Sequence, residues 1–166
     1  MNLKLTSQAY LMLLFSCLFS LDIQSQVDKD FFKAMEYRFV GPYRGGRVTT
    51  VAGIPAQKHT FFMGSTGGGV WKTVDGGGSW KNISDKDIKC GSIGAIELAP
   101  SDPQVMYVGT GSASPRGNIS AGIGMFRSED GGDSWKSIGL EDAGQIGKIQ
   151  VHPNDPDLVY AAVLGN

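Results

Sequence analysis

The chain has 166 residues, 24 glycines, 19% charged residues and a formal net charge of -1 at pH 7. Abundant glycine with few charges favours an all-β protein rich in tight turns. The near-neutral charge, without a cluster of Lys and Arg, argues against nucleic acid as a partner. His59 and His152 stand alone in or next to turns, so the sequence predicts no metal site and no cofactor.

The first 25 residues have the pattern of a secretory signal peptide. Lys4 supplies the positive charge, Ala9 to Leu21 form an apolar stretch too short to span a bilayer, and Ile23-Gln24-Ser25 is an acceptable cleavage site. We therefore expect a secreted, periplasmic or cell-surface protein with no stable membrane span after cleavage; an uncleaved anchor is the alternative. Cleavage leaves Cys90 as the remaining cysteine, expected to be half-buried and structural.

Residues 26–36 carry mixed charge, and we expect them to form a short helical or extended lead-in. From residue 37 to 166 the chain is repetitive. The run Ile93–Pro100 recurs as Ile146–Pro153, and Val105–Val108 recurs as Leu158–Ala161, both 53 positions later (100 to 153, 105 to 158). A weaker copy lies 45 positions earlier, where Pro55 corresponds to Pro100. Internal repeats of this length indicate a repeat architecture.

Each repeat contains short apolar runs separated by turn residues. They lie at 47–52, 60–65, 69–74 and 79–83, then at 93–98, 105–110, 124–128 and 134–138, and finally at 146–151 and 158–164. Four strands in a repeat of roughly 45 to 55 residues predict a β-propeller blade. We therefore expect an all-β propeller of four-stranded antiparallel blades, with blades at 46–84 and 93–139 and a half blade at 146–166.

Residues 37–40 lie one strand before the first blade. They correspond to the strands that begin at Trp80 and Trp135 in the later units. We expect them to be the outermost strand of a last blade, where they would close the ring and remove an open edge. A propeller has about four to eight blades. The sequence therefore predicts the N-terminal part of a longer chain, whose remaining blades and downstream domains are its partners.

An eight-residue pattern occurs twice, at 73–80 and 128–135, with the order Ser/Thr, any, Asp, Gly, Gly, any, Ser, Trp. The Asp carboxylate is expected to accept hydrogen bonds from backbone N–H groups two or three residues on, and the glycines to supply positive φ. The Trp offers an apolar face to the next strand. The residues expected to hold these turns are Thr73, Asp75, Gly77, Trp80, Ser128, Asp130, Gly132 and Trp135.

This octet resembles the Asp-box, or BNR repeat, of sialidases, sortilin-type receptors and several secreted glycosidases. Residues 41–48, 67–73, 107–111 and 145–153 are also similar to a family of large secreted bacterial proteins described as sortilin-N-terminal-like or BNR-repeat glycosyl-hydrolase-like. The resemblance runs from about Tyr37 to the end of the chain, and it implies a many-bladed propeller followed by further domains. Relatives often have an acidic residue at the position of Ser112, so a catalytic carboxylate there would be missing.

The Asp-box hairpins of a propeller join the third and fourth strands, so the other loops emerge on the opposite face, where ligands usually bind. These loops are 41–46, 65–68, 84–92, 111–123 and 140–145. Arg44, Arg47 and Arg116 on this face are candidates for bidentate binding of a carboxylate or sulfate. Glu141 and Asp142 are further ligand candidates there. The alternative is that each arginine covers its own blade or pairs locally.

The sequence thus favours a binding module that recognises glycan or peptide at the mouth of the propeller channel. The alternative is a secreted glycoside hydrolase whose two catalytic carboxylates lie in other blades, and a third possibility is a structural propeller that docks neighbouring domains. Nothing in the sequence establishes the separation of the loop acids, so the catalytic residues stay unknown.

Overall fold

The structure is a computed structural model that describes residues 29–33, 35, 46–114 and 117–165. The chain divides into two units, 1–42 and 43–166. The described part of the first unit contains a short 3-10 helix, η1 (Lys29–Phe32). The expected signal peptide, the closing strand at 37–40, Arg44 and Arg116 lie outside the described residues. Where the structure describes the chain, it contains no helix both long and apolar enough to cross a membrane.

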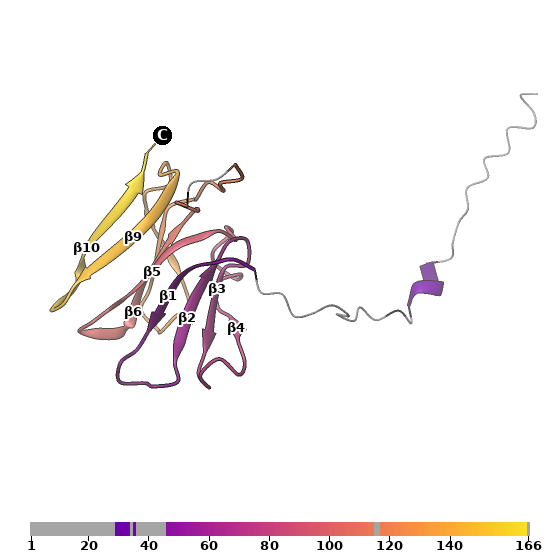
Figure 1. Cartoon of the computed structure of the whole chain (residues 1–166), viewed down its shortest axis with the longest axis horizontal. Helices are drawn as coiled ribbons and strands as arrows, with labels where there is room; N and C mark the ends of the chain where they lie inside the picture. Colours follow the sequence, from indigo (N-terminus) through magenta and orange to yellow (C-terminus); the bar gives the residue numbers. More distant parts are fainter. Residues whose placement is uncertain (1–28, 34, 36–45, 115–116, 166) are drawn as a thin grey trace, which may run out of the picture. The chain divides into compact units, whose positions relative to one another are not determined.

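The second unit consists of antiparallel β-sheets in which each strand pairs with the next along the chain (Figure 1). The first sheet has the order β1 (Val48–Gly53), β2 (Phe61–Ser65), β3 (Val70–Thr73), β4 (Lys81–Asn82). The second has the order β5 (Ile93–Ala99), β6 (Asp102–Thr110), β7 (Met125–Ser128), β8 (Lys136–Gly139). In the third, β9 (Gln145–His152) pairs with β10 (Asp155–Leu164). The prediction of an all-β fold with four-stranded antiparallel blades is confirmed.

The first strands of the three sheets, β1, β5 and β9, lie next to one another. Their close approach depends on glycine. A Cβ atom on Gly94 of β5 would lie 2.2 Å from the carbonyl oxygen of Ile146 and 2.4 Å from that of Gly111. Neither oxygen belongs to a flexible side chain that could move aside, so residues larger than glycine would push the inner strands apart.

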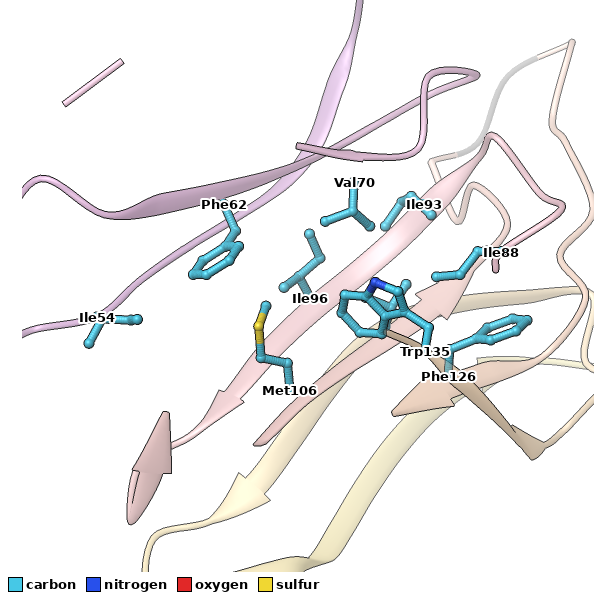
Figure 2. Packing of buried hydrophobic residues seen from close by; sticks show 10 residues of the cluster. Ile54, Phe62, Val70, Ile88, Ile93, Ile96, Met106, Phe126 and Trp135 are labelled. Carbon is cyan, nitrogen blue, oxygen red and sulfur yellow. The ribbon is translucent and has the colours of Figure 1, made fainter. Parts of the chain in front are cut away.

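An apolar cluster holds the first two sheets face to face. Phe62 and Val70 of the first sheet meet Ile96, Met106 and Trp135 of the second (Figure 2). Along β2, buried residues alternate with more exposed ones, so one set of side chains points into this layer. Along β6, residues 105–110 are all buried, because both faces of the second sheet are covered. Burial of these apolar side chains is the main favourable contribution to the stacking of the sheets.

A second cluster joins the second and third sheets, with Val105 and Tyr107 on one side and Ile146, Ile149 and Val151 on the other. The two interfaces repeat in detail at their inner edges. A Cβ atom on Gly109 would lie 2.4 Å from Cγ2 of Ile146, and a Cβ atom on Gly64 would lie 2.6 Å from Cγ2 of Ile93. The repeat therefore preserves the contact between neighbouring sheets as well as the strands within each sheet.

Two strands start earlier than the apolar runs predict. β6 begins at Asp102 and β10 at Asp155, each three residues ahead of the expected start. In both turns the Asp carboxylate accepts a hydrogen bond of 3.0 Å from the backbone N–H two residues on, at Gln104 and at Asp157. The strand registers shift just after these turns, so the early pairing is accommodated by β-bulges.

Candidate functional site

Both octets form hairpins with matching hydrogen bonds. In the first, the Thr73 hydroxyl donates to Oδ1 of Asp75 (2.7 Å) and accepts the N–H of Gly77 (2.9 Å). The Asp75 carboxylate accepts the N–H (2.9 Å) and the hydroxyl (2.6 Å) of Ser79. The N–H accepted at 2.9 Å is therefore four residues on, one beyond the expected range, and the Gly78 N–H three residues on also stabilises the carboxylate. Gly76 and Gly77 have φ of 75° and 99°, the positive values expected of these glycines.

The second hairpin repeats every one of these bonds. Ser128 donates to Asp130 (2.7 Å) and accepts from Gly132 (2.9 Å), and Asp130 accepts the N–H (2.9 Å) and the hydroxyl (2.5 Å) of Ser134. Gly131 and Gly132 have φ of 68° and 95°. Equal geometry at sites 55 positions apart (75 to 130) shows that the turn is encoded by its own eight residues.

The same hydrogen bonds stabilise the charged form of each Asp. The side-chain bond from Ser134, followed by that from Ser128, lowers the pKa of Asp130 from 3.8 to about 2. The Ser79 side chain likewise holds the pKa of Asp75 far below its usual range. Carboxylates that stay ionised and engaged in the turn are poorly suited to general acid–base chemistry near neutral pH. Across the ranges that the structure describes, no group of three or more His, Cys, Asp or Glu residues is placed to hold a metal ion.

The loops that lead into the inner strands, together with the β2–β3 and β6–β7 loops, lie at the opposite end of the sheets. We call this end the loop face and define it as residues 46–47, 65–69, 83–92, 111–114, 117–124 and 140–144. Gly67 and Gly69 donate to the Gly91 carbonyl at 2.9 and 2.8 Å. The Gly122 N–H donates to the Gly144 carbonyl at 2.7 Å. Each blade's loop is thus tied to the linker of the next blade.

Three of the predicted ligand residues can be located. Arg47 is exposed and directly precedes β1, and its carbonyl accepts the Thr66 N–H at 2.9 Å. Glu141 and Asp142 are exposed in the linker that precedes β9, and Glu141 accepts a hydrogen bond of 3.4 Å from the Ser137 hydroxyl. Arg47 and the two acids therefore stand at the same end of the sheets but on different blades. Their ligand role stays a prediction.

Two buried hydroxyls on the loop face were missed by the sequence reasoning. Thr66 and Ser92 form an isolated bridge between the first blade and the linker to the second. Oγ1 of Thr66 and Oγ of Ser92 are buried without a hydrogen-bond partner within the described ranges. The sequence carries no signal for them, because their burial results from the stacking of two sheets. Ser112, where the family resemblance led us to look for an acid, is fully buried.

A cavity of about 440 Å³ lies at the end of the sheets that carries the two octet hairpins, where no ligand was expected. The β1–β2 and β5–β6 hairpins form it, and its lining is largely aliphatic, with Ile54, Pro55, Leu98 and Pro103 among the residues. Such a surface offers few hydrogen-bond donors or acceptors for sugar hydroxyls. We therefore keep the loop face as the candidate site for a polar ligand.

Comparison with known proteins supports the fold. No family model and no curated protein matches the sequence. The chain is similar to the crystal structure of an ancestral GH74 enzyme, with 20% identity, a TM-score of 0.55, and coverage of 69% of this chain and 16% of that chain. It is also similar to the GH74 xyloglucanase from Xanthomonas campestris, with 16% identity, a TM-score of 0.41, and coverage of 73% of this chain and 28% of that chain.

The chain therefore spans 16% and 28% of the length of these two proteins. The first similarity agrees with the stacked four-stranded sheets. The fold is that of a partial β-propeller. An identity of 20% indicates shared fold alone, because unrelated activities recur on the same fold.

Proposed function

We propose that this chain forms the wall of a secreted Asp-box propeller, of the BNR or sortilin-like type, that binds glycan at its loop face. The observation that carries the proposal is the similarity of the stacked sheets to an ancestral GH74 enzyme, a member of a group of propeller-type glycoside hydrolases. The two Asp-box hairpins and the signal-peptide pattern at 1–25 support the finer assignment.

The geometry of the loop face favours this end for ligand binding. Its backbone hydrogen bonds join consecutive blades, which gives the exposed Arg47, Glu141 and Asp142 a rigid base. A rigid scaffold with charged and polar groups suits a hydroxyl-rich ligand, whose recognition depends on placed hydrogen bonds. The remaining blades and downstream domains of a longer chain would complete the ring and enlarge the site.

A glycan array probed with the purified chain tests the proposal. We expect retention of one polysaccharide class. Arg47→Ala should weaken it several-fold because it removes a charged hydrogen-bond donor, and Glu141→Gln should do so because it replaces a charged acceptor with a neutral amide. Lys58→Ala is the matched control: Lys58 is an exposed cation in the β1–β2 hairpin at the other end of the sheets, so binding should not change. Absence of any glycan signal, or equal losses in the control, would contradict the assignment.

A glycoside hydrolase is the second candidate, favoured by the same fold similarity. Hydrolysis needs two carboxylates that flank the scissile bond, and the catalytic pair would be contributed by other blades. Release of reducing ends from polysaccharide by the longer chain tests this function. Binding without release in that assay would leave the binding module as the activity.

A further inference from the structure

Leu140, in the linker between the second and third sheets, has a backbone conformation that is unusual for a leucine. Its φ is 59°, and among the described residues it is the one non-glycine residue with a positive φ. In this region the Cβ atom of an L-residue lies too close to the following carbonyl oxygen, so glycine, asparagine or aspartate normally occupies it. Leu140 is nevertheless 49% exposed. The chain therefore holds a strained leucine whose side chain is only half-covered by the fold.

Neighbouring residues enforce this conformation. The preceding Gly139 has a φ of 102°, and the Leu140 carbonyl accepts the Ala143 N–H at 3.0 Å. The segment also packs tightly against Gly124 of the β6–β7 loop. A Cβ atom on Gly124 would lie 2.4 Å from the Gly139 oxygen and 3.1 Å from the carbonyl carbon of Leu140. Strain of this kind persists only where the surroundings impose it, and it gathers at ligand-binding positions.

The exposure of Leu140 is a property of its place in the linker. Its counterpart in the preceding linker, 55 positions earlier, is Asp85. Asp85 is followed by a complete four-stranded sheet and is exposed as well. A neighbouring sheet therefore does not cover this position.

The β6–β7 loop places a second aliphatic side chain beside this linker. The Gly122 N–H donates to the Gly144 carbonyl at 2.7 Å, and the Ile123 N–H donates to the buried Thr110 hydroxyl at 2.7 Å. Ile123 is nevertheless 39% exposed. Because Gly124 packs on the linker, Ile123 and Leu140 belong to adjacent backbone segments. Both are thus exposed from a rigid part of the loop face.

The side chains of the loop face restrict which apolar group can bind there. As defined above from described residues, the face contains no aromatic side chain, so it offers no flat ring to the face of a sugar. An aliphatic pair fits a small alkyl group instead. A sugar carries such a group when it is a 6-deoxyhexose or when it is acetylated. Glu141, exposed directly after Leu140, can accept a hydrogen bond from a hydroxyl of the same sugar.

We propose that Leu140 and Ile123 form a subsite for a methyl group carried by the bound sugar, from either a 6-deoxyhexose or an acetyl group. The inference rests on the glycan function proposed above and names a feature that the ligand must have. Leu140 is then a specificity-determining residue. Glycine at this position would relieve the strain and remove the contact at the same time.

The test compares glycans that differ by this group, on an array probed with the purified chain. One pair of oligosaccharides ends in L-fucose or in L-galactose, which differ only in the 6-hydroxyl. The other pair is an acetylated oligosaccharide before and after alkaline deacetylation. We expect the methyl-bearing member of one pair to bind about four- to tenfold more tightly, as burial of one such group provides. The pair that shows the preference identifies the source of the methyl group.

Leu140→Gly separates binding from folding. Glycine adopts a positive φ without strain, so the unfolding temperature should stay the same or rise, while the preference for the methyl-bearing glycan should disappear. Val74→Gly is the matched control, because Val74 is an aliphatic residue with 66% exposure on the first octet hairpin. Its φ is not positive. Val74→Gly should therefore lower the unfolding temperature and leave the preference unchanged.

The outcomes distinguish this inference from the glycan function. Equal binding of both members in each pair, or a preference that persists in Leu140→Gly, would overturn the inference and leave the glycan function standing. A marked fall in the unfolding temperature of Leu140→Gly would also overturn it, because the leucine would then be serving the fold. Retention of no glycan at all would overturn both proposals.

Discussion

The hairpins formed by the two octets share their internal hydrogen bonds but differ in their surroundings. Trp135 is 6% exposed in the layer between the first and second sheets, whereas Trp80 is only half-buried. The Trp135 indole donates to the Ile83 carbonyl at 2.8 Å, and its backbone N–H donates to Asp87 at 3.1 Å. The turn is therefore a local structure, while the tryptophan contributes fully only where another sheet covers it.

The same distinction applies to the two sheet interfaces. Lys72 lies over the Phe62 ring at 5.5 Å, and Arg127 lies over the Tyr107 ring at 5.7 Å. Tyr107 also donates from its hydroxyl to the Pro156 carbonyl at 2.7 Å, a bond that Phe62 lacks the atom to make. Both interfaces therefore have a cation over an aromatic ring. They differ in the ring, because only the tyrosine can donate a hydrogen bond to the neighbouring sheet.

The largest expected effect comes from removing the two tryptophans. Trp135→Ala should lower the free energy of unfolding by about 3–5 kcal/mol, because it leaves a cavity between two sheets. Trp80→Ala should cost less than half of that, since its ring is already partly in water. Urea denaturation of both variants measures the difference. Equal losses would mean that the tryptophans act within their own hairpins.

Substituting the second glycine of each turn sharpens the comparison. Gly77→Ala and Gly132→Ala should each cost about 1–2 kcal/mol, because L-residues resist positive φ. Gly132→Ala should cost a further 1–3 kcal/mol or so from overpacking, as its Cβ atom would lie 2.6 Å from Ile83, whereas the nearest atom to a Cβ on Gly77 is 3.8 Å away. Thermal unfolding measures both variants; matching losses would show that Ile83 moves aside freely.

Tyr107→Phe makes the second interface chemically like the first. Loss of the bond to the Pro156 carbonyl should lower the free energy of unfolding by about 0.5–1.5 kcal/mol. Hydrogen exchange in β9 and β10 should accelerate more than in β1 and β2, since the bond holds the third sheet. Phe62→Tyr serves as the control and should bring no gain. Uniform acceleration across all three sheets would argue against a local role.

The smallest expected effect is on the dependence of folding stability on acidic pH. The folded-state pKa of Asp130 is about 2, against 3.8 for the ordinary group, so its contribution to stability is present above about pH 4 and is lost as pH falls toward 2. Asp130→Asn should therefore lose stability near neutral pH and show a flatter decline between about pH 4 and pH 2. Asp75→Asn should show the same sign, with the loss extending to lower pH. Urea midpoints across this range measure both; an unchanged slope would show that the carboxylate is not linked to folding. Because both groups are exposed, screening keeps the effects small.

Much of the fold was predictable from local patterns. The alternation of apolar residues and the turn chemistry of each octet indicated where strands begin and end, and the 53-residue offset indicated that blades repeat. Hairpin bonds such as Ser79 to Asp75 span four residues, so they depend on sequence neighbours alone. The start of β6 at Asp102 was missed because the register shift near Ala99 is set by pairing with β5.

The candidate site was less predictable. The sequence placed Arg47, Glu141 and Asp142 on loops of one face, but their separation depends on how far each blade rotates from the last. Buried hydroxyls at Thr66 and Ser92 and the aliphatic cavity beside Pro55 had no local signal, because they arise where residues from two sheets meet.

By itself, the sequence determined the repeat, the tight glycine turns and the strand order, because these follow from the conformational preferences of neighbouring residues. Only the tertiary structure decided which of two equivalent tryptophans is buried, and which of two equivalent cations meets a turn carbonyl, as Lys72 does across 59 positions at Gly131. The reason is that burial and long-range hydrogen bonds depend on whether a neighbouring sheet is present. The sequence of one repeat does not determine which sheet packs against it.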